Sequence, residues 1–218
     1  MGQIIMNLRG STRKTRTFIA GLCLRLLTPN LYQDLKKAAL LGDDSVRSFN
    51  YRPSTITIRK AYGNKPLIGI EIGTGYGYNA MSLLRGLNIK RLYCIDPFVP
   101  YVDGDNSYKA DPAMRAQQTI RMLSLFDNVT FIRKSSSEAV NDIKELKEPI
   151  DFVYIDGNHA YECAIADMQN YYPLLHEKGI LAGHDINWFS VRKALMDFCG
   201  QNNINPIIKT PDWIIIKS

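Results

Sequence analysis

The chain has 218 residues, of which 45% are hydrophobic, and this supports one domain with a full core, with or without a terminal extension. No run of about 18 uninterrupted apolar residues occurs, so we expect no membrane-spanning helix. The net charge of +6 is concentrated before Asp34, where five basic residues stand without an acid. The rest of the chain is nearly neutral, so no nucleic-acid partner is expected for it.

The four cysteines are far apart in the sequence and form no Cys-x-x-Cys pair: Cys23, Cys94, Cys163 and Cys199. This spacing argues against a zinc cluster and against a disulfide framework. We therefore expect reduced, buried thiols and a cytoplasmic location.

Residues 1–60 are predicted to form a basic N-terminal extension with one or two helices. The apolar stretch 18–27 is short and interrupted by Arg25, which favours an amphipathic helix over a secretory signal. Its apolar face would pack on the domain, on the second subunit of a homodimer or on an anionic membrane surface, and packing on protein is favoured. A second helix is predicted at 29–41, and residues 54–58 alternate as in a short strand or a loop.

From residue 61 to 218, strand and helix patterns alternate, which predicts one α/β domain with a doubly wound, mostly parallel, seven-stranded sheet. The strands are predicted at 67–72, 91–95, 129–132, 150–155, 180–183, 204–208 and 213–216. Helices are predicted at 79–84, 113–126, 137–146, 161–175 and 189–199. Only four residues join the last two strands, too few for a parallel crossover, so the last strand is expected to be antiparallel.

The first predicted strand runs into a turn with glycine at every second position: Gly73, Gly75 and Gly77. A helical pattern follows, so bare backbone and free helix N–H groups would face a ligand there. The dinucleotide spacing G-x-G-x-x-G is absent, and Glu71 would repel phosphates. A carboxylate at this position suits a ligand with a cationic amino-acid end, contacted directly or through water. The alternative is a glycine turn that holds no ligand.

Residues 71–77, Glu-x-Gly-x-Gly-x-Gly, resemble motif I of the class I S-adenosylmethionine-dependent methyltransferases. The resemblance implies a Rossmann-like methyltransferase fold, whose sheet closes with a reversed strand. It also implies that S-adenosylmethionine is the cofactor and that Glu71, Gly73, Gly75 and Tyr76 lie beside it.

Further candidates follow the second and third strands, because ligands of open parallel sheets bind at the carboxyl ends of the strands. Asp96 could accept hydrogen bonds from ribose hydroxyls, and an exposed loop acid is the alternative. For Ser136 and Ser137 the resemblance implies an adenine contact nearby. An equal alternative is that one of these serines caps the next helix, with Glu138 in its first turn.

The fourth strand ends in Asp-Gly-Asn-His at 156–159 and the fifth in His184-Asp185, so two acids and two histidines are expected to meet. Asp-Gly-x-His-x-Tyr followed by a His-Asp pair resembles the metal-assisted sugar and small-molecule O-methyltransferases. The resemblance implies that Asp156, His184 and Asp185 hold a divalent cation such as Mg²⁺, that Asp156 also borders the cofactor, and that His159 is the general base. His184 stands where relatives have a carboxylate, so an imidazole-accepting cation is the alternative to Mg²⁺.

We therefore predict methyl transfer to a hydroxyl of a small molecule or sugar, because an alcohol needs a base and histidine titrates near neutrality. The insertion at 97–111 is expected to cover the cofactor or line the acceptor pocket, bordered by Tyr161, Trp188 and Phe189. The alternatives are a nicotinamide-dependent oxidoreductase, a nucleic-acid methyltransferase that uses the basic N-terminus, and a binding domain without activity. The Asn/Asp-Pro-Pro-Tyr/Phe tetrad of amino-group methylation does not occur in the sequence.

Overall fold

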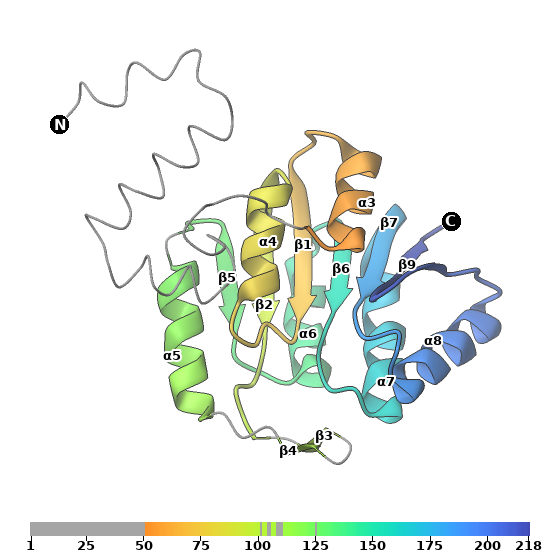
Figure 1. The fold of residues 1–218 in the computed structure, drawn as a ribbon. Helices are drawn as coiled ribbons and strands as arrows, with labels where there is room; N and C mark the ends of the chain where they lie inside the picture. Colours follow the sequence, from red (N-terminus) through yellow and green to blue (C-terminus); the bar gives the residue numbers. More distant parts are fainter. Residues whose placement is uncertain (1–50, 101, 104–105, 108–110, 125) are drawn as a thin grey trace. The chain divides into compact units, whose positions relative to one another are not determined.

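The computed structural model describes residues 51–218 except 101, 104–105, 108–110 and 125. Seven strands form one sheet in the order β5-β2-β1-β6-β7-β9-β8 (Figure 1). They are β1 (Leu67–Ile72), β2 (Ile89–Ile95), β5 (Val129–Ile132), β6 (Ile150–Ile155), β7 (Leu175–Gly183), β8 (Ile207–Lys209) and β9 (Asp212–Ile216). A separate small hairpin, β3 (Val102–Asp103) and β4 (Asn106–Ser107), lies in the predicted insertion.

Strand direction follows the prediction. The pairs β5–β2, β2–β1, β1–β6 and β6–β7 are parallel, whereas β9 runs antiparallel to both β7 and β8. This confirms a mostly parallel sheet with an antiparallel last strand. The carboxyl ends of β1, β2, β6 and β7 therefore meet at one edge.

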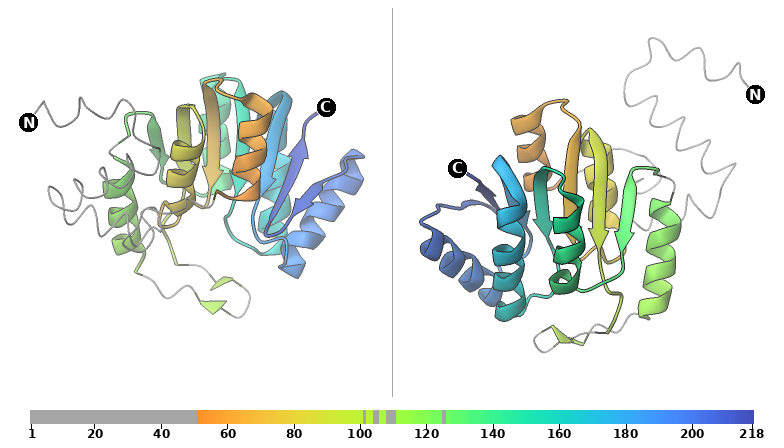
Figure 2. Two further views of the ribbon diagram at one scale, coloured as in Figure 1. Left: turned by 45° about the horizontal axis from the view of Figure 1, so that its top comes forward. Right: turned by 180° about the vertical axis from the view of Figure 1, so that it is seen from behind.

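Helices cover both faces of the sheet (Figures 1 and 2). On one face lie α3 (Pro53–Tyr62) and α4 (Tyr78–Gly86), and on the other lie α6 (Ser136–Leu146), α7 (Tyr161–Tyr171) and α8 (Phe189–Asn202). The remaining helix, α5 (Pro112–Leu123), approaches the glycine turn, where Thr119 Oγ1 donates to the Gly75 carbonyl at 2.6 Å.

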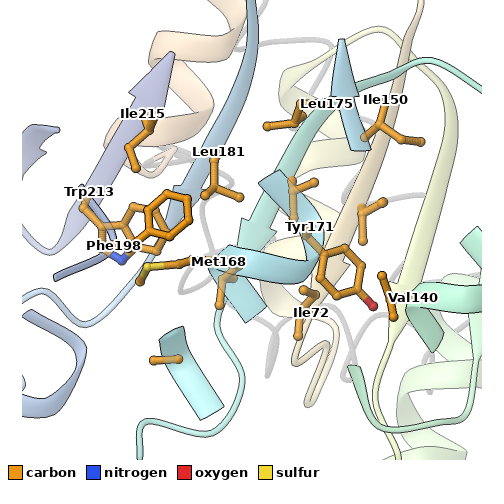
Figure 3. Packing of buried hydrophobic residues seen from close by; sticks show 14 of the residues in the cluster. Ile72, Val140, Ile150, Met168, Tyr171, Leu175, Leu181, Phe198, Trp213 and Ile215 are labelled. Atoms are coloured by element: carbon orange, nitrogen blue, oxygen red, sulfur yellow. The ribbon is translucent and has the colours of Figure 1, made fainter. Parts of the chain in front are cut away.

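The main hydrophobic core lies between the sheet and the α6–α8 face. Every residue of β1 and β6 is buried, which suits strands covered on both sides. Figure 3 shows Leu181, Trp213 and Ile215 of the sheet beside Met168 of α7 and Phe198 of α8. This packing fixes the strand ends that carry the candidate site.

The predicted strand or loop at 54–58 is wrong, because these residues belong to α3. The compact unit spans Tyr51–Ser218, so the domain begins before the predicted boundary at residue 61. Proline at the first helical position and the burial of Ser54, Thr55 and Ile58 explain the difference. The helices predicted at 18–27 and 29–41 lie outside the described residues.

Smaller differences concern the ends of elements. The helix predicted at 161–175 ends at Tyr171, and a short 3₁₀ turn (Tyr172–Leu174) leads into β7, which is longer than predicted. The strand predicted at 204–208 is shorter and shifted, as β8. Cys94 and Cys199 are buried free thiols as expected, whereas Cys163 is exposed. Among the described helices, none is both long and apolar enough to cross a membrane.

Candidate active site

The glycine turn after β1 packs directly against the end of β6. Gly73, Gly75 and Gly77 all have positive φ, at 81°, 55° and 76°. A Cβ added to Gly73 would lie 2.0 Å from the carbonyl oxygen of Asp156, so only glycine fits there. A Cβ on Gly75 would meet only Gly73 O, at 3.9 Å, so its bare backbone borders a cavity of about 670 Å³.

Asp96, at the end of β2, holds this turn in place. Its Oδ2 accepts from Gly75 N at 2.8 Å and its Oδ1 accepts from Phe98 N at 2.7 Å. The Arg115 guanidinium lies 3.8 Å from Oδ1. The carboxylate also lines the cavity, so the exposed-acid alternative is wrong, while its predicted contact with a ribose stays a prediction.

Glu71 lies behind the turn rather than in the cavity wall. Its side chain is 1% exposed, and its Oε1 accepts from Asn79 Nδ2 at 2.9 Å. Burial raises the pKa of Glu71 to about 8, although the bond from Asn79 opposes this. Asn79 does line the cavity, so Glu71 would act on a ligand through Asn79 and not by the direct contact considered above.

The serines after β5 lie beside the cavity, but the helix cap is not one of the two predicted serines. Ser135, not Ser136 or Ser137, is the N-cap of α6, where it forms a capping box with Glu138. All three serines line the cavity. The adenine contact therefore stays a prediction, and the capping prediction is corrected by one residue.

The expected meeting of two acids and two histidines is observed at the ends of β6 and β7. His159 Nε2 lies 2.7 Å from Asp185 Oδ2, and His184 Nδ1 lies 3.0 Å from the same oxygen. Asp156 Oδ1 lies 3.7 Å from His184 Nδ1 and 4.0 Å from His159 Nε2. The imidazole of His159 also stacks on Trp188, with centroids 4.7 Å apart.

The two carboxylates of this cluster differ in their surroundings. Burial alone would raise the pKa of Asp185, but the adjacent imidazoles of His159 and His184 outweigh it and hold the pKa well below its usual range. Burial raises the pKa of Asp156, although Arg52 and both histidines oppose this. Asp185 therefore stays ionised at neutral pH and fixes the orientation of His159.

Arg52 is a site residue that the sequence patterns did not indicate. It is the N-cap residue of α3 and lines the cavity, with Nη1 3.3 Å from Asp156 Oδ2. The same Nη1 donates to Tyr154 Oη at 2.5 Å. Contacts between segments so distant in sequence leave no local spacing signal.

The donor set suits Mg²⁺ poorly. Donor atoms of Asp156, His184 and Asp185 lie within 4.8 Å of one another, as predicted for a cation site. Mg²⁺ prefers near-octahedral oxygen ligands, whereas here one donor is an imidazole and both carboxylates already pair with basic side chains. These residues do not fit Mg²⁺.

Asn79, a residue of the cavity lining, carries a buried polar atom suited to a ligand. Asn79 Oδ1 is buried and has no hydrogen-bond partner among the residues that the structure describes. An N–H donor of a bound molecule would satisfy it. A cofactor with an amino group at this end of the glycine turn fits that requirement.

The methyltransferase domain family matches residues 70–186, more than half of the chain. The chain belongs to this methyltransferase family. The matched range includes the glycine turn, Asp96, the serines after β5 and the histidine–aspartate cluster. This assignment decides against the nicotinamide-dependent alternative.

Relatives of this methyltransferase include the uncharacterized protein R132 of Acanthamoeba polyphaga mimivirus, 30% identical over 118 residues. That alignment covers 53% of this chain and 50% of R132, so the methyltransferase spans about half the length of this relative. The likeness therefore concerns a shared domain.

Solved structures share the fold of the methyltransferase. The calicheamicin methyltransferase CalS11 has a TM-score of 0.59 at 16% identity, covering 94% of this chain and 93% of CalS11. An O-methyltransferase from Bacillus cereus in complex with SAH has a TM-score of 0.55 at 16% identity, covering 93% of this chain and 99% of its own. Family and fold together confirm the resemblance to class I S-adenosylmethionine-dependent methyltransferases.

Proposed function

We propose that this methyltransferase methylates a hydroxyl of a small molecule or sugar, with His159 as general base. The observation that carries the proposal is the 2.7 Å contact of His159 Nε2 with Asp185 Oδ2, made by a histidine that lines the same cavity as the glycine turn. An imidazole oriented by a carboxylate beside a cofactor cavity is suited to accept a proton.

The cofactor would lie along the ends of β1, β2 and β5. The bare backbone of Gly73 and Gly75 would face it, with Asp96 towards the ribose, Ser136 and Ser137 towards the adenine, and Asp156 at the reacting end. Tyr76, in the same turn, also lines the cavity. When bound, S-adenosylmethionine supplies an activated methyl group, so the chain mainly has to hold and align the acceptor.

His159 would remove the acceptor proton. Asp185 holds the imidazole of His159 through Nε2, and the imidazole would take the proton as the hydroxyl attacks. The ionised Asp185 then stabilises the imidazolium that results. No metal ion is required for this step, in keeping with a donor set that does not fit Mg²⁺.

The aromatic ring of Trp188 next to His159 favours a small acceptor with a flat face, although Tyr161, Trp188 and Phe189, expected to border the acceptor pocket, do not line the cavity. Trp188 stacks on the imidazole at an interplanar angle of 27°, and the following residue, Phe189, is 79% exposed. A phenol ring or the apolar face of a sugar can pack on such a surface. The acceptor class proposed is therefore a hydroxyl-bearing phenol or sugar.

The test replaces His159 by Gln or Ala in the full-length chain and measures transfer of labelled methyl groups to a panel of phenols and sugars. Turnover should fall by about 10²–10⁴-fold, the usual contribution of a general base. The affinity for SAH, measured by calorimetry, should stay almost unchanged, because His159 lies at the acceptor end.

His176→Gln is the matched control. His176, at the start of β7, pairs with Asp151 of β6 and does not line the cavity. This variant should keep the turnover of the wild type. Loss of SAH binding in His159→Gln would reassign His159 to the cofactor. Undiminished turnover in that variant would refute its role as base.

A further inference from the structure

Arg52 connects the start of α3 to the end of β6. Its guanidinium contacts Tyr154 Oη at 2.5 Å and Asp156 Oδ2 at 3.3 Å. Tyr154 Oη in turn donates to Asp212 Oδ1 at 3.2 Å. The other oxygen of Asp212 accepts from Ser54 N at 3.0 Å and from Ser54 Oγ at 2.5 Å. The guanidinium is thus the end of a continuous polar chain through the domain.

The side chains that link Arg52 to the start of α3 are fully buried. Tyr154, Asp212 and Ser54 are each 0% exposed, so their hydrogen bonds cannot be replaced by bonds to solvent. The guanidinium carbon of Arg52 also lies 5.5 Å from the centre of the Tyr154 ring. The charge of Arg52 is therefore held in position before any ligand arrives.

Among the described residues, Arg52 is one of three basic side chains that face the carboxylate of Asp156. Oδ2 of Asp156 faces the guanidinium, and Oδ1 faces His184 and His159 at 3.7 and 4.0 Å. Asp185 takes the closest contact of each histidine. A divalent cation in this cluster would have to lie beside the fixed charge of Arg52 and share carboxylates that are already paired.

We propose, on the basis of the function proposed above, that Arg52 is a positioning residue of the methyl-transfer site: it orients Asp156 and supplies the fixed positive charge of the acceptor end in place of a divalent cation. The side chain lines the cavity, so its charge favours an acceptor oxygen that is losing its proton. Removal of this charge converts Asp156, His184 and Asp185 into a cation site.

The experiment titrates Mn²⁺ into the full-length wild type and into Arg52→Gln and Arg52→Lys, with free Mn²⁺ followed by electron paramagnetic resonance. Arg52→Gln should bind Mn²⁺ about tenfold more tightly than the wild type, or better, because a neighbouring positive charge is gone. Arg52→Lys keeps the charge and should bind as weakly as the wild type. Lys60→Ala, an exposed residue of α3, removes the same charge at a distance and should change nothing.

Calorimetry with SAH on the same proteins separates a positioning role from a cofactor contact. All variants should bind SAH with nearly the wild-type affinity. Weaker SAH binding in Arg52→Gln without a gain in Mn²⁺ affinity would assign Arg52 to the cofactor and overturn the proposal. Equal Mn²⁺ affinity in all proteins would also overturn it.

The wild type alone provides a decisive measurement if Arg52→Gln fails to fold. Micromolar binding of Mn²⁺ by the wild type would contradict the proposal, whereas weak binding agrees with it. Neither Mn²⁺ nor SAH binding depends on the acceptor. Failure to find a methylated hydroxyl would therefore count against the proposed function and leave the result for Arg52 intact.

Discussion

Two residues with a left-handed backbone conformation, one after β1 and one after β7, shape the site. Gly73, with φ of 81°, allows the turn after β1 to touch the backbone of Asp156. Asp185 adopts φ of 56°, a conformation in which a non-glycine residue is usually strained by about 1–2 kcal/mol. That conformation occurs where one carboxylate oxygen meets both imidazoles. Local strain is thus located where it orients the proposed base.

Glu71→Gln should change how stability depends on pH. The pKa of Glu71 is raised from 4.5 to about 8 in the folded state, mainly by burial. Between these values the folded chain holds a proton that the unfolded chain has released, so the free energy of unfolding falls as pH rises through this window. The variant lacks this loss and should be more stable than the wild type at pH 8.5 by about 1–3 kcal/mol.

Urea unfolding at pH 5, 6, 7 and 8.5 measures the effect as the difference between variant and wild type. The difference cancels contributions of other groups, among them Asp167, whose pKa burial raises to about 6. Glu145→Gln, at an exposed position of α6, is the matched control and should show a small difference at every pH. A Glu71→Gln difference that is constant with pH would contradict the raised pKa.

At the scale of elements, α6 depends on its capping box. Ser135→Ala removes the side chain that accepts from Glu138 N and so leaves an N–H of the first turn unsatisfied. The free energy of unfolding should fall by about 1 kcal/mol, measured by urea unfolding. Ser124→Ala, which removes only an exposed bond to Arg121 O after α5, is the control. An equal loss in both variants would show that capping contributes nothing here.

The starts of α3 and α6 show where sequence patterns were not enough to predict the helices correctly. Residues 54–58 alternate with β-branched side chains, which favours a strand in isolation. Burial of Ser54, Thr55 and Ile58 against the domain instead follows helical spacing, and Pro53 was the overlooked start signal. Ser135 was missed as the cap for a related reason: neighbouring serines are chemically alike, and only backbone angles distinguish them.

For the whole domain, the order and direction of the strands could be predicted from the alternating pattern and from connection lengths. The rule that ligands bind at strand ends then grouped Asp96, Asp156, His159 and Asp185 correctly at one edge. Arg52 could not be found in this way, because it precedes the first strand and reaches the site only through the packing of α3. Contacts set by tertiary packing leave no trace in local spacing.

The packing of α3 predicts which part of the chain folds as a unit. A chain that starts at Tyr51 keeps all of α3 and should unfold cooperatively and bind SAH, since the compact unit spans Tyr51–Ser218. A chain that starts at Gly63 lacks Ile58, which is 0% exposed, and both bonds from Ser54 to Asp212. A buried carboxylate without these donors and an uncovered core should together remove several kcal/mol of stability.

Urea unfolding and SAH calorimetry on the two truncated chains test this directly. The chain from Tyr51 should retain a single transition, whereas the chain from Gly63 should be largely unfolded, because a loss of several kcal/mol is comparable with the whole stability of a domain. Asp212→Asn in the longer chain separates the two causes, since it removes the buried charge and leaves the cover of α3 in place. Native-like unfolding of the chain from Gly63 would show that α3 is an appendage, and then Arg52 could not be held firmly enough to orient Asp156.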